Sequence, residues 1–276
     1  MSSLLKLHPV SAVFGAFLCL NQSCTDSSAV EKITVTGSST LAPLVADMAG
    51  LFEAKNPGIR IDVQAGGSSR GILDASSSLA DIGMTSRNLK AGENGLTSHR
   101  IALDGIALIV HSQNPVSDLS HDQVISIFTG KTEFWNEGND RKIVVVNKAE
   151  GRGTLEVFLK HFELDSADID ADLIVGENQQ AIKTVSGNPL AIGYVSIGAA
   201  EYEAANGTPI RLLAVDGVTA TSKTVAEGTY PISRPLLLVT KGHAVPAGLT
   251  GRFVEFCQST AVHELIGSHL YVPVRE

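Results

Sequence analysis

Four short turns rich in glycine and hydroxyl residues join a strand pattern to a helical pattern in this chain. They are Gly37-Ser38-Ser39-Thr40, Gly66-Gly67-Ser68-Ser69, Thr85-Ser86-Arg87 and Gly151-Arg152-Gly153-Thr154. A helix start leaves backbone N–H groups unpaired and carries partial positive charge. Glycine lets a ligand approach the main chain, and serine and threonine add O–H donors. Several converging helix starts therefore predict a cage for a small oxyanion.

The order of the strand and helix patterns predicts an α/β fold. A β-α-β-α order favours a largely parallel sheet with helices on both faces. Apolar runs or period-two alternation predict strands at residues 33–35, 59–63, 80–84, 101–110, 143–146, 191–195 and 235–240. Helical spacing predicts helices at residues 41–53, 71–79, 119–128, 155–162, 179–186 and 249–266.

Two lobes are expected from the length of 276 residues, since a domain usually takes about 100–200 residues. The long apolar strands 101–110 and 235–240 are natural crossover points between lobes. We therefore expect a discontinuous lobe 1 (31–108 plus 231–276) and an inserted lobe 2 (109–230). The ligand cleft is expected between the lobes, where such sheets usually bind ligands.

The formal net charge of −8 argues against nucleic acid or an anionic membrane as a partner, because both attract basic surfaces. It also means that long-range electrostatic steering repels an anion. Affinity for an anion must therefore come from local dipoles and a few placed cations. The candidates are Arg70, Arg87, Lys148 and Arg152, which lie in or beside the turns. Arg87 has a plainer alternative interpretation as a surface ion pair of little energetic weight.

Residues 1–30 resemble an export signal, because a basic start precedes the apolar run 10–20, which is too short to span a bilayer. The sequence before Cys24 resembles a bacterial lipoprotein cleavage site. Two interpretations stay open: a lipid anchor through Cys24, or ordinary signal cleavage near Ser23 or Ala29.

The remaining cysteine, Cys257, lies in an apolar helical stretch, which predicts a buried and inert thiol. The pair His263 and His269 does not form a zinc motif. A spacing of six places the two imidazoles about 240° apart around a helix. We expect no metal and no cofactor.

Two alternatives compete with the oxyanion cage. A serine or threonine before a helix is often only an N-cap, worth about 1 kcal/mol, and this applies to Ser39, Thr40, Ser68 and Thr154. In addition, Gly67-Ser68-Ser69-Arg70-Gly71 matches G-x-S-x-G, the nucleophile turn of serine hydrolases, with Ser69 as nucleophile. The preceding strand has the alternating pattern of a half-solvated strand, whereas a nucleophile turn usually ends a buried one. His243 is a remaining candidate for the base.

Taken together and in order, the motifs resemble the periplasmic phosphate-binding proteins of bacterial ABC importers. The resemblance spans Ile33 to about Tyr271. Its motifs are Gly37-Ser38-Ser39-Thr40-Leu41-Ala42-Pro43, Gln64-Ala65-Gly66-Gly67-Ser68-Ser69, Ala80-Asp81-Ile82-Gly83, Ile127-Phe128-Thr129-Gly130-Lys131 with Trp135, Val146 to Thr154, and Ala191-Ile192-Gly193-Tyr194. It implies a type II-like periplasmic-binding-protein fold: two lobes, each with a mostly parallel central sheet flanked by helices.

The resemblance also implies a ligand set for inorganic phosphate: Ser39, Thr40, Ser68, Ser86, Arg87, Lys148, Arg152, Gly153 and Thr154. Three positions depart from the family pattern, one of them Lys148, which stands at a usual arginine. Ser86 stands where the family often has an aspartate that accepts a proton from phosphate, and Arg152 stands at a usual serine. A carboxylate acceptor rejects sulfate. The preference among phosphate, sulfate and arsenate therefore stays open.

By this resemblance the chain is an exported, periplasmic or cell-envelope binding protein and not an enzyme. It closes around phosphate by hinge motion and passes it to a membrane ABC permease as a monomer. The alternatives are the serine hydrolase, and a sensor or scavenger of phosphate without a transport role.

Overall fold

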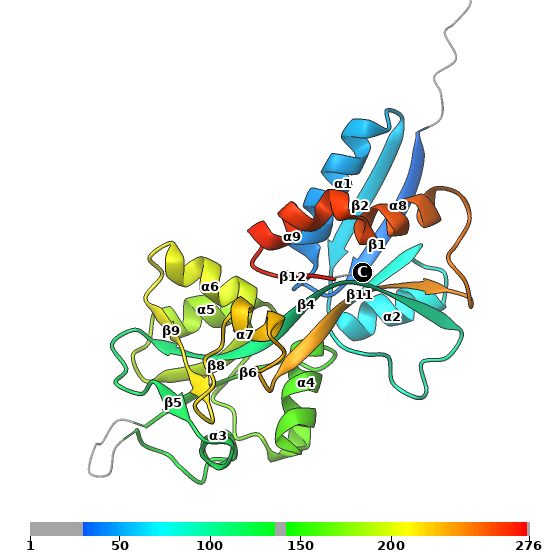
Figure 1. The fold of residues 1–276 in the computed structure, drawn as a ribbon. Helices are drawn as coiled ribbons and strands as arrows, with labels where there is room; N and C mark the ends of the chain where they lie inside the picture. The colour runs from blue at the N-terminus through cyan, green and yellow to red at the C-terminus, as the bar shows by residue number, and fades with distance from the viewer. Residues whose placement is uncertain (1–29, 136–141, 275–276) are drawn as a thin grey trace, which may run out of the picture.

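The computed structural model describes residues 30–135 and 142–274, which fold around one curled mixed sheet (Figure 1). The strand order along the sheet is β2-β1-β3-β11-β4-β8-β6-β7. The outer strands pair in parallel, whereas β11 and β4 at the centre run antiparallel to each other and to their other neighbours. The predicted α/β class is confirmed. The export signal and Cys24 lie outside the described residues.

The first half of the molecule is built from the two ends of the described chain. Its elements are β1 (Glu31–Gly37), α1 (Ala42–Lys55), β2 (Ile59–Ala65), α2 (Ser68–Ser76), β3 (Ile82–Thr85), α8 (Gly248–Gln258), the 3₁₀ turn η2 (Thr260–Val262), α9 (His263–Ser268) and β12 (Val272–Pro273). Figure 1 shows α1, α8 and α9 on one side of the strands and α2 on the other.

The second half lies between these two segments in the sequence. Its elements are β5 (Asp118–Leu119), α3 (His121–Phe128), β6 (Val144–Lys148), α4 (Gly153–Phe162), η1 (Ser166–Asp168), β7 (Leu173–Val175), α5 (Asn178–Ser186), β8 (Ala191–Ser196), α6 (Ile197–Ala205), β9 (Ile210–Leu212), β10 (Ala214–Val215) and α7 (Ser222–Ala226). Among the described residues no helix has the length and apolar content that a membrane crossing requires.

Two long strands, β4 (Leu96–His111) and β11 (Ser233–Lys241), connect the halves (Figure 1). The buried apolar side chains form two clusters, one in each half. In β4, Ile101 and Ala102 belong to the first cluster and residues 106–110 to the second. Ile232, just before β11, belongs to the second cluster, whereas Leu236, within β11, belongs to the first cluster. Both strands therefore pass between the two cores.

Glycines let α2 approach the sheet closely. A Cβ atom on Gly71 would lie 2.6 Å from the Thr36 carbonyl oxygen and 2.7 Å from the Gly37 Cα. A Cβ atom on Gly83 of β3 would lie 2.8 Å from the Gly71 carbonyl carbon. These distances leave no room for side chains. The helix start at Ser68 is thereby held against the ends of β1 and β3.

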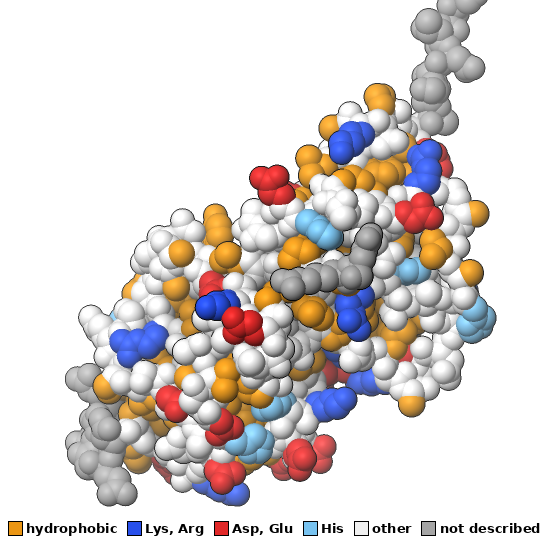
Figure 2. Space-filling view, in the orientation of Figure 1, with side chains coloured by type: hydrophobic (Ala, Val, Ile, Leu, Met, Phe, Trp, Pro, Cys, Tyr) orange, Lys and Arg blue, Asp and Glu red, His pale blue; other side chains and the backbone are white. Residues whose placement is uncertain are grey.

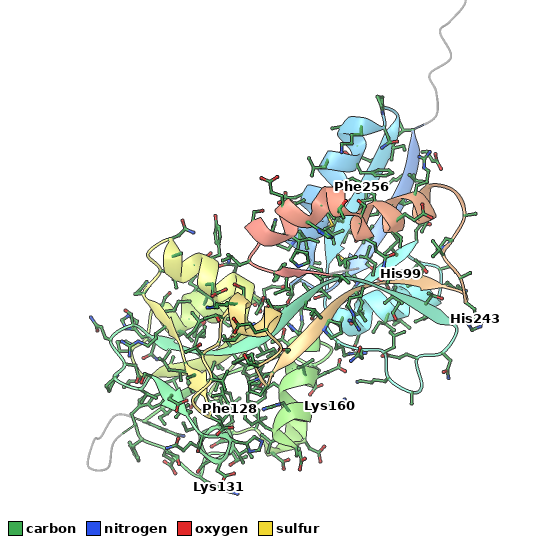
Figure 3. The ribbon with its side chains drawn as sticks, viewed as in Figure 1. His99, Phe128, Lys131, Lys160, His243 and Phe256 are labelled. Carbon is green, nitrogen blue, oxygen red and sulfur yellow. The ribbon has the colours of Figure 1, made fainter. Side chains whose placement is uncertain are left out.

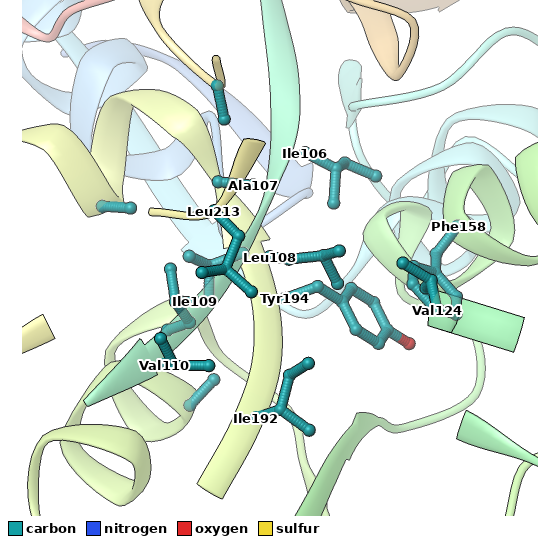
Figure 4. Close-up of a cluster of buried hydrophobic side chains, with 14 of the residues drawn as sticks. Ile106, Ala107, Leu108, Ile109, Val110, Val124, Phe158, Ile192, Tyr194 and Leu213 are labelled. Carbon is teal, nitrogen blue, oxygen red and sulfur yellow. The ribbon is translucent and has the colours of Figure 1, made fainter. Parts of the chain in front are cut away.

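The second core fixes the start of α4. Phe158 of α4 stacks on Tyr194 of β8 with ring centroids 4.0 Å apart (Figure 4), and Phe128 packs at 4.7 Å from Phe158. The Tyr194 hydroxyl donates to Asn147 Oδ1 at 2.5 Å and accepts from the Lys148 backbone N–H at 3.4 Å. A buried tyrosine needs such partners for its hydroxyl. The end of β6 and the turn before α4 are therefore positioned by packing.

Two sequence expectations about local structure are wrong. Residues 249–266 do not form one long helix, because the chain is extended at Ser259 and splits them into α8, η2 and α9. The Ser259 hydroxyl donates to the Phe256 carbonyl at 2.7 Å, a bond that competes with continuation of the helix. The turn Thr85-Ser86-Arg87 starts no helix either; an irregular segment with two glycines leads from it to β4. Cys257 is buried as predicted, and burial raises the pKa of its thiol.

Candidate functional site

Three of the glycine and hydroxyl turns meet at the carboxyl ends of β1, β2 and β6. The backbone N–H groups of Gly66 and Gly67 donate to the Gly37 carbonyl at 2.7 and 2.9 Å. The Ser69 N–H donates to the Gly151 carbonyl at 3.1 Å, a bond that joins the first half to the second. The parallel strands β1 and β2 bring their carboxyl ends, and the turns that follow, to one edge of the sheet. Strand β6 belongs to the second half and runs in the opposite direction, so its carboxyl end meets theirs from that half.

The hydroxyl groups of these turns do not cap the helices that follow. None of the helix starts of α1, α2 and α4 has a side-chain capping hydrogen bond. Thr40, Ser68, Ser86 and Thr154 are instead buried, each at most 5% exposed. Ser68 Oγ accepts from the Ser86 backbone N–H at 3.1 Å and lies 3.4 Å from Ser86 Oγ. The N-cap interpretation is therefore wrong for Thr40, Ser68 and Thr154.

The centre of this hydroxyl cluster is a residue that the sequence analysis missed, Arg234 of β11. Its Nη1 donates to Thr154 Oγ1 at 2.9 Å and to Ser86 Oγ at 3.2 Å, and its Nη2 donates to Thr40 Oγ1 at 3.3 Å. The guanidinium therefore contacts hydroxyls from both halves of the molecule. We call Thr40, Ser68, Ser86, Thr154 and Arg234 the hydroxyl cage.

Arg234 is held by Asp104, which lies directly opposite it in the β11–β4 pair. Its Nε and Nη2 donate to Asp104 Oδ2 at 3.0 and 2.8 Å, and both side chains are 1% exposed. The signal for this pair was present in the sequence. Asp104 is the lone charge in the apolar strand pattern 101–110, and Arg234 directly precedes the apolar strand pattern 235–240. A buried charge requires a partner of opposite sign.

The direction of these hydrogen bonds restricts what the cage can bind. Arginine only donates, so Thr40, Ser86 and Thr154 accept from Arg234 through their oxygens. Their O–H hydrogens then point to acceptors other than Arg234. Among the hydrogen bonds of the described residues, none of these three hydroxyls has an assigned protein acceptor; the Ser68–Ser86 contact fits either direction. A ligand rich in acceptor oxygens completes this set.

Gly153 lies at the floor of the cage. A Cβ atom there would overlap Ser68 Oγ and would lie 2.8 Å from Ser86 Oγ. The first residue of α4 must therefore be glycine for the hydroxyls of the first half to reach the helix start of the second.

Asn178 and Ser39 border the cage. Asn178, the first residue of α5, donates from Nδ2 to Thr40 Oγ1 at 3.3 Å, another bond between the halves. It is a further residue that the sequence analysis missed. Ser39 lies in the same turn as Thr40 and is partly exposed.

Arg87, predicted as a ligand, lies in an ion-pair group beside the cage. Its Nη1 and Nη2 donate to the two carboxylate oxygens of Glu93 at 2.8 and 2.7 Å. Its Nε lies 2.8 Å from Glu156 Oε2, an ion pair without the angles of a hydrogen bond. Lys90 also pairs with Glu156. The charge of Arg87 is therefore directed to two carboxylates.

Lys148 and Arg152, also predicted as ligands, both contact Glu177. Arg152 Nη1 donates to Glu177 Oε1 at 2.6 Å, and Lys148 Nζ donates to the Glu177 carbonyl at 2.8 Å. Lys148 is 3% exposed. Burial is the main cause that lowers its pKa to about 7; the carboxylate of Glu177 opposes this, and the charges of Arg234 and Arg152 add to it.

A cleft of about 900 Å³ opens beside the cage, between residues 87–91 of the first half and α4 of the second. Residues 231–235 also line the cleft, and Arg234 is one of them. Figure 2 shows acidic and basic side chains interspersed over the visible face, without a large area of one sign. The affinity of the site for a charged ligand therefore depends on the groups inside it.

The arrangement around Ser69 does not match a serine hydrolase. Ser69 Oγ donates to Glu156 Oε1 at 2.9 Å and accepts from Arg87 Nη2 at 3.3 Å. Within residues 30–135 and 142–274 no histidine is hydrogen-bonded to Ser69, and His243 lies at the outer end of β11 (Figure 3). The same residues contain no group of three histidine, cysteine or acidic side chains that suits a metal ion.

Comparisons with known proteins show what this chain is similar to. The model of the PBP superfamily domain matches residues 23–261. The phosphate-binding protein PstS of Bacillus subtilis (strain 168) is 32% identical over 258 residues, which cover 91% of this chain and 83% of that protein.

Two solved structures share the fold. One, from Clostridium perfringens, is described as a phosphate ABC transporter substrate-binding protein with bound phosphate; it has a TM-score of 0.81 and 33% identity, and the match covers 89% of this chain and 100% of that chain. The other is an ABC-type phosphate transport receptor from Vibrio cholerae, with a TM-score of 0.73, 30% identity and coverage of 88% and 100%. These matches confirm the fold expected from the sequence motifs.

Proposed function

The chain belongs to the PBP superfamily and, within it, to the PstS family of phosphate-binding proteins, and on that premise we propose that it captures inorganic phosphate in the hydroxyl cage. The observation that carries this proposal is the polarity of the cage. Thr40, Ser86 and Thr154 accept from Arg234 and so keep their O–H groups as donors to a ligand. Phosphate supplies acceptor oxygens on every side.

Backbone groups add to these donors. The helix starts of α2 and α4 face each other across the cage, and each has N–H groups without partners in its own helix. Gly153 allows the main chain of α4 to approach the ligand. The proposed ligand set is Ser39, Thr40, Ser68, Ser86, Gly153 and Thr154, with Arg87, Lys148 and Arg152 contributing through their ion-pair and hydrogen-bond networks.

The two halves act as lobes in this proposal. Residues 31–108 with 231–276 form lobe 1 and residues 109–230 form lobe 2, joined by β4 and β11 as hinge strands. Supporting this division, the two buried clusters separate within β4 and just before β11. A ligand that contacts both lobes stabilises the closed conformation over the open one.

We place the chain as the exported receptor of an ABC importer. Residues 1–30 direct export, with the lipid anchor at Cys24 and simple cleavage both open, and the closed monomer delivers phosphate to a membrane permease. Catalysis is not part of this function, and neither are nucleic acids, metals or cofactors.

A calorimetric titration with phosphate, sulfate, arsenate and molybdate at two pH values tests the binding function. We expect saturable one-to-one binding of phosphate, and sulfate binding with equal affinity would contradict a phosphate-specific role. Uptake of radioactive phosphate by starved cells that lack the gene separates transport from sensing. Loss of uptake, restored by the wild-type gene, is expected. Unchanged uptake would favour a sensor or scavenger. Turnover of ester or phosphoester substrates would instead support the hydrolase.

A further inference from the structure

We propose that Arg234, positioned by Asp104, supplies the permanent positive charge that acts on the bound anion, through the three hydroxyls that it contacts. This inference rests on the proposed phosphate-binding function, because it assigns the counter-charge of the same site. It differs from the sequence expectation, which placed that charge on the arginines and the lysine of the turns.

The two arginines of the turns are paired with carboxylates and donate to none of the cage hydroxyls. Arg87 donates to both oxygens of Glu93 and lies against Glu156, and Arg152 donates to Glu177 at 2.6 Å. A guanidinium that gave up such partners would leave buried or half-buried carboxylates without a counter-charge, which is costly.

Lys148 carries a variable charge. Its Nζ already donates to the Glu177 carbonyl, and it is 3% exposed. Because burial lowers its pKa to about 7, only a part of the molecules carry this charge at neutral pH. An arginine stays protonated at every physiological pH.

Arg234 presents its inner edge to the cage. Its Nε–Nη2 edge is taken by Asp104 Oδ2, and the other edge, formed by Nη1 and Nη2, donates to Thr154, Ser86 and Thr40. Asp104 therefore acts as a positioning residue that fixes the plane of the Arg234 guanidinium group. The inner edge polarises three hydroxyls, whose O–H groups become stronger donors to an anion.

The position in the hinge strands gives this charge a second role. Arg234 and Asp104 pair across β11 and β4, where the chain passes between the two cores. The hydroxyls that Arg234 contacts come from both halves: Thr40 and Ser86 from the first, Thr154 from the second. An anion held at Arg234 is therefore within reach of both halves when they close.

The test compares two pairs of neutralising substitutions by calorimetric titration with inorganic phosphate. Asp104→Asn with Arg234→Gln removes both charges and keeps polar partners in both positions, so it avoids an unpaired buried charge. We expect it to weaken phosphate binding by at least about 30-fold, as loss of a charged hydrogen-bonding group does. The matched control is Asp62→Asn with Lys32→Gln, the exposed ion pair between β2 and β1, for which less than about threefold is expected.

The outcomes separate this inference from the proposed function. If the wild-type chain binds no phosphate, the proposed function fails and this inference with it. If the wild-type binds phosphate and the Asp104–Arg234 pair variant binds it within threefold, only the inference is overturned. It is also overturned if Arg152→Gln with Glu177→Gln costs more affinity than the Asp104–Arg234 variant.

If the variant Asp104→Asn with Arg234→Gln does not fold, as judged by far-ultraviolet circular dichroism, a second variant tests the role of Arg234. Arg234→Lys keeps a positive charge opposite Asp104 but lacks the planar fork that reaches three hydroxyls at once. We expect it to fold and to bind phosphate at least about tenfold more weakly. Unchanged affinity in Arg234→Lys would overturn the assignment.

Discussion

The Ser69 hydroxyl of α2 donates to the Glu156 carboxylate of α4 at 2.9 Å, so one side-chain bond joins a helix of the first half to a helix of the second. Arg87 and Lys90 of the first half pair with the same carboxylate. Glu156 therefore collects three partners from the opposite half beside the cleft. This position suits a latch that stabilises the closed conformation.

Removal of the latch should accelerate release of the ligand. We expect Glu156→Ala to raise the phosphate dissociation rate about tenfold in stopped-flow experiments, because partly buried ion pairs of this kind contribute about 1–2 kcal/mol. Small-angle X-ray scattering should show a larger radius of gyration for the ligand-free variant than for the wild type. The control is Glu255→Gln, an exposed site on α8. Identical release rates in Glu156→Ala and the control would refute the latch.

A methyl group at Gly153 should block the cage. In Gly153→Ala the added Cβ would overlap Ser68 Oγ and press on Ser86 Oγ, so we expect a loss of phosphate affinity of tenfold or more. Overpacking of this kind also destabilises the fold, by about 1–3 kcal/mol. The matched substitution Gly50→Ala on α1 meets no atom within 4 Å. It should leave binding unchanged and stabilise the chain by about 0.5–1 kcal/mol, as alanine does in a helix. Equal affinities for the two variants would contradict the close approach at Gly153.

The buried Lys148 should make stability depend on pH in a defined window. Burial lowers its pKa from 10.5 to about 7 in the folded chain. Between these values the unfolded chain binds a proton that the folded chain does not, so the free energy of unfolding should rise with pH. Below about pH 7 the ammonium is charged in both states and the cost of its burial is fully present.

Comparison of the wild type with Lys148→Met isolates this effect. Across pH 7 to 10 we expect the free energy of unfolding of the wild type, relative to the variant, to rise by at most about 1.4 kcal/mol per pH unit. Urea denaturation of the ligand-free protein measures it. Because burial also raises the pKa of Tyr194 and other tyrosines, only the difference between the two proteins is informative. Parallel profiles for both proteins would show that Lys148 does not titrate in this range.

Much of the fold follows from the sequence because local patterns and packing agree there. The strand patterns from residue 33 to residue 195 correspond to β1, β2, β3, β4, β6 and β8 apart from their ends, whereas the short strands β5 and β7 were not predicted. The extended Ser259, which divides the expected helix 249–266, depends on a hydroxyl-to-carbonyl bond that helical periodicity does not reveal. The pairing of β4 with β11 at the centre of the sheet is likewise a long-range contact that no local pattern contains.

The site was predicted in part. The turns predict Thr40, Ser68, Ser86 and Thr154 as site residues, because glycine and hydroxyl residues at a helix start are typical of a ligand site. Arg234 and Asp104 lie 130 positions apart in the sequence and belong to none of the four glycine and hydroxyl turns. Their proximity arises only when β4 and β11 pair. The ion pairs of Arg87 with Glu156 and of Arg152 with Glu177 likewise form only in the folded chain. The sequence position of the two arginines therefore does not reveal that carboxylates lie against them.

The most direct test of the central claim is a phosphate titration of the wild type beside the double variant Ser68→Ala with Thr154→Ala. The account predicts saturable one-to-one binding by the wild type. It predicts no detectable binding by the double variant, which should keep the wild-type circular dichroism spectrum. Undiminished phosphate affinity in the folded double variant would contradict the hydroxyl cage as the binding site.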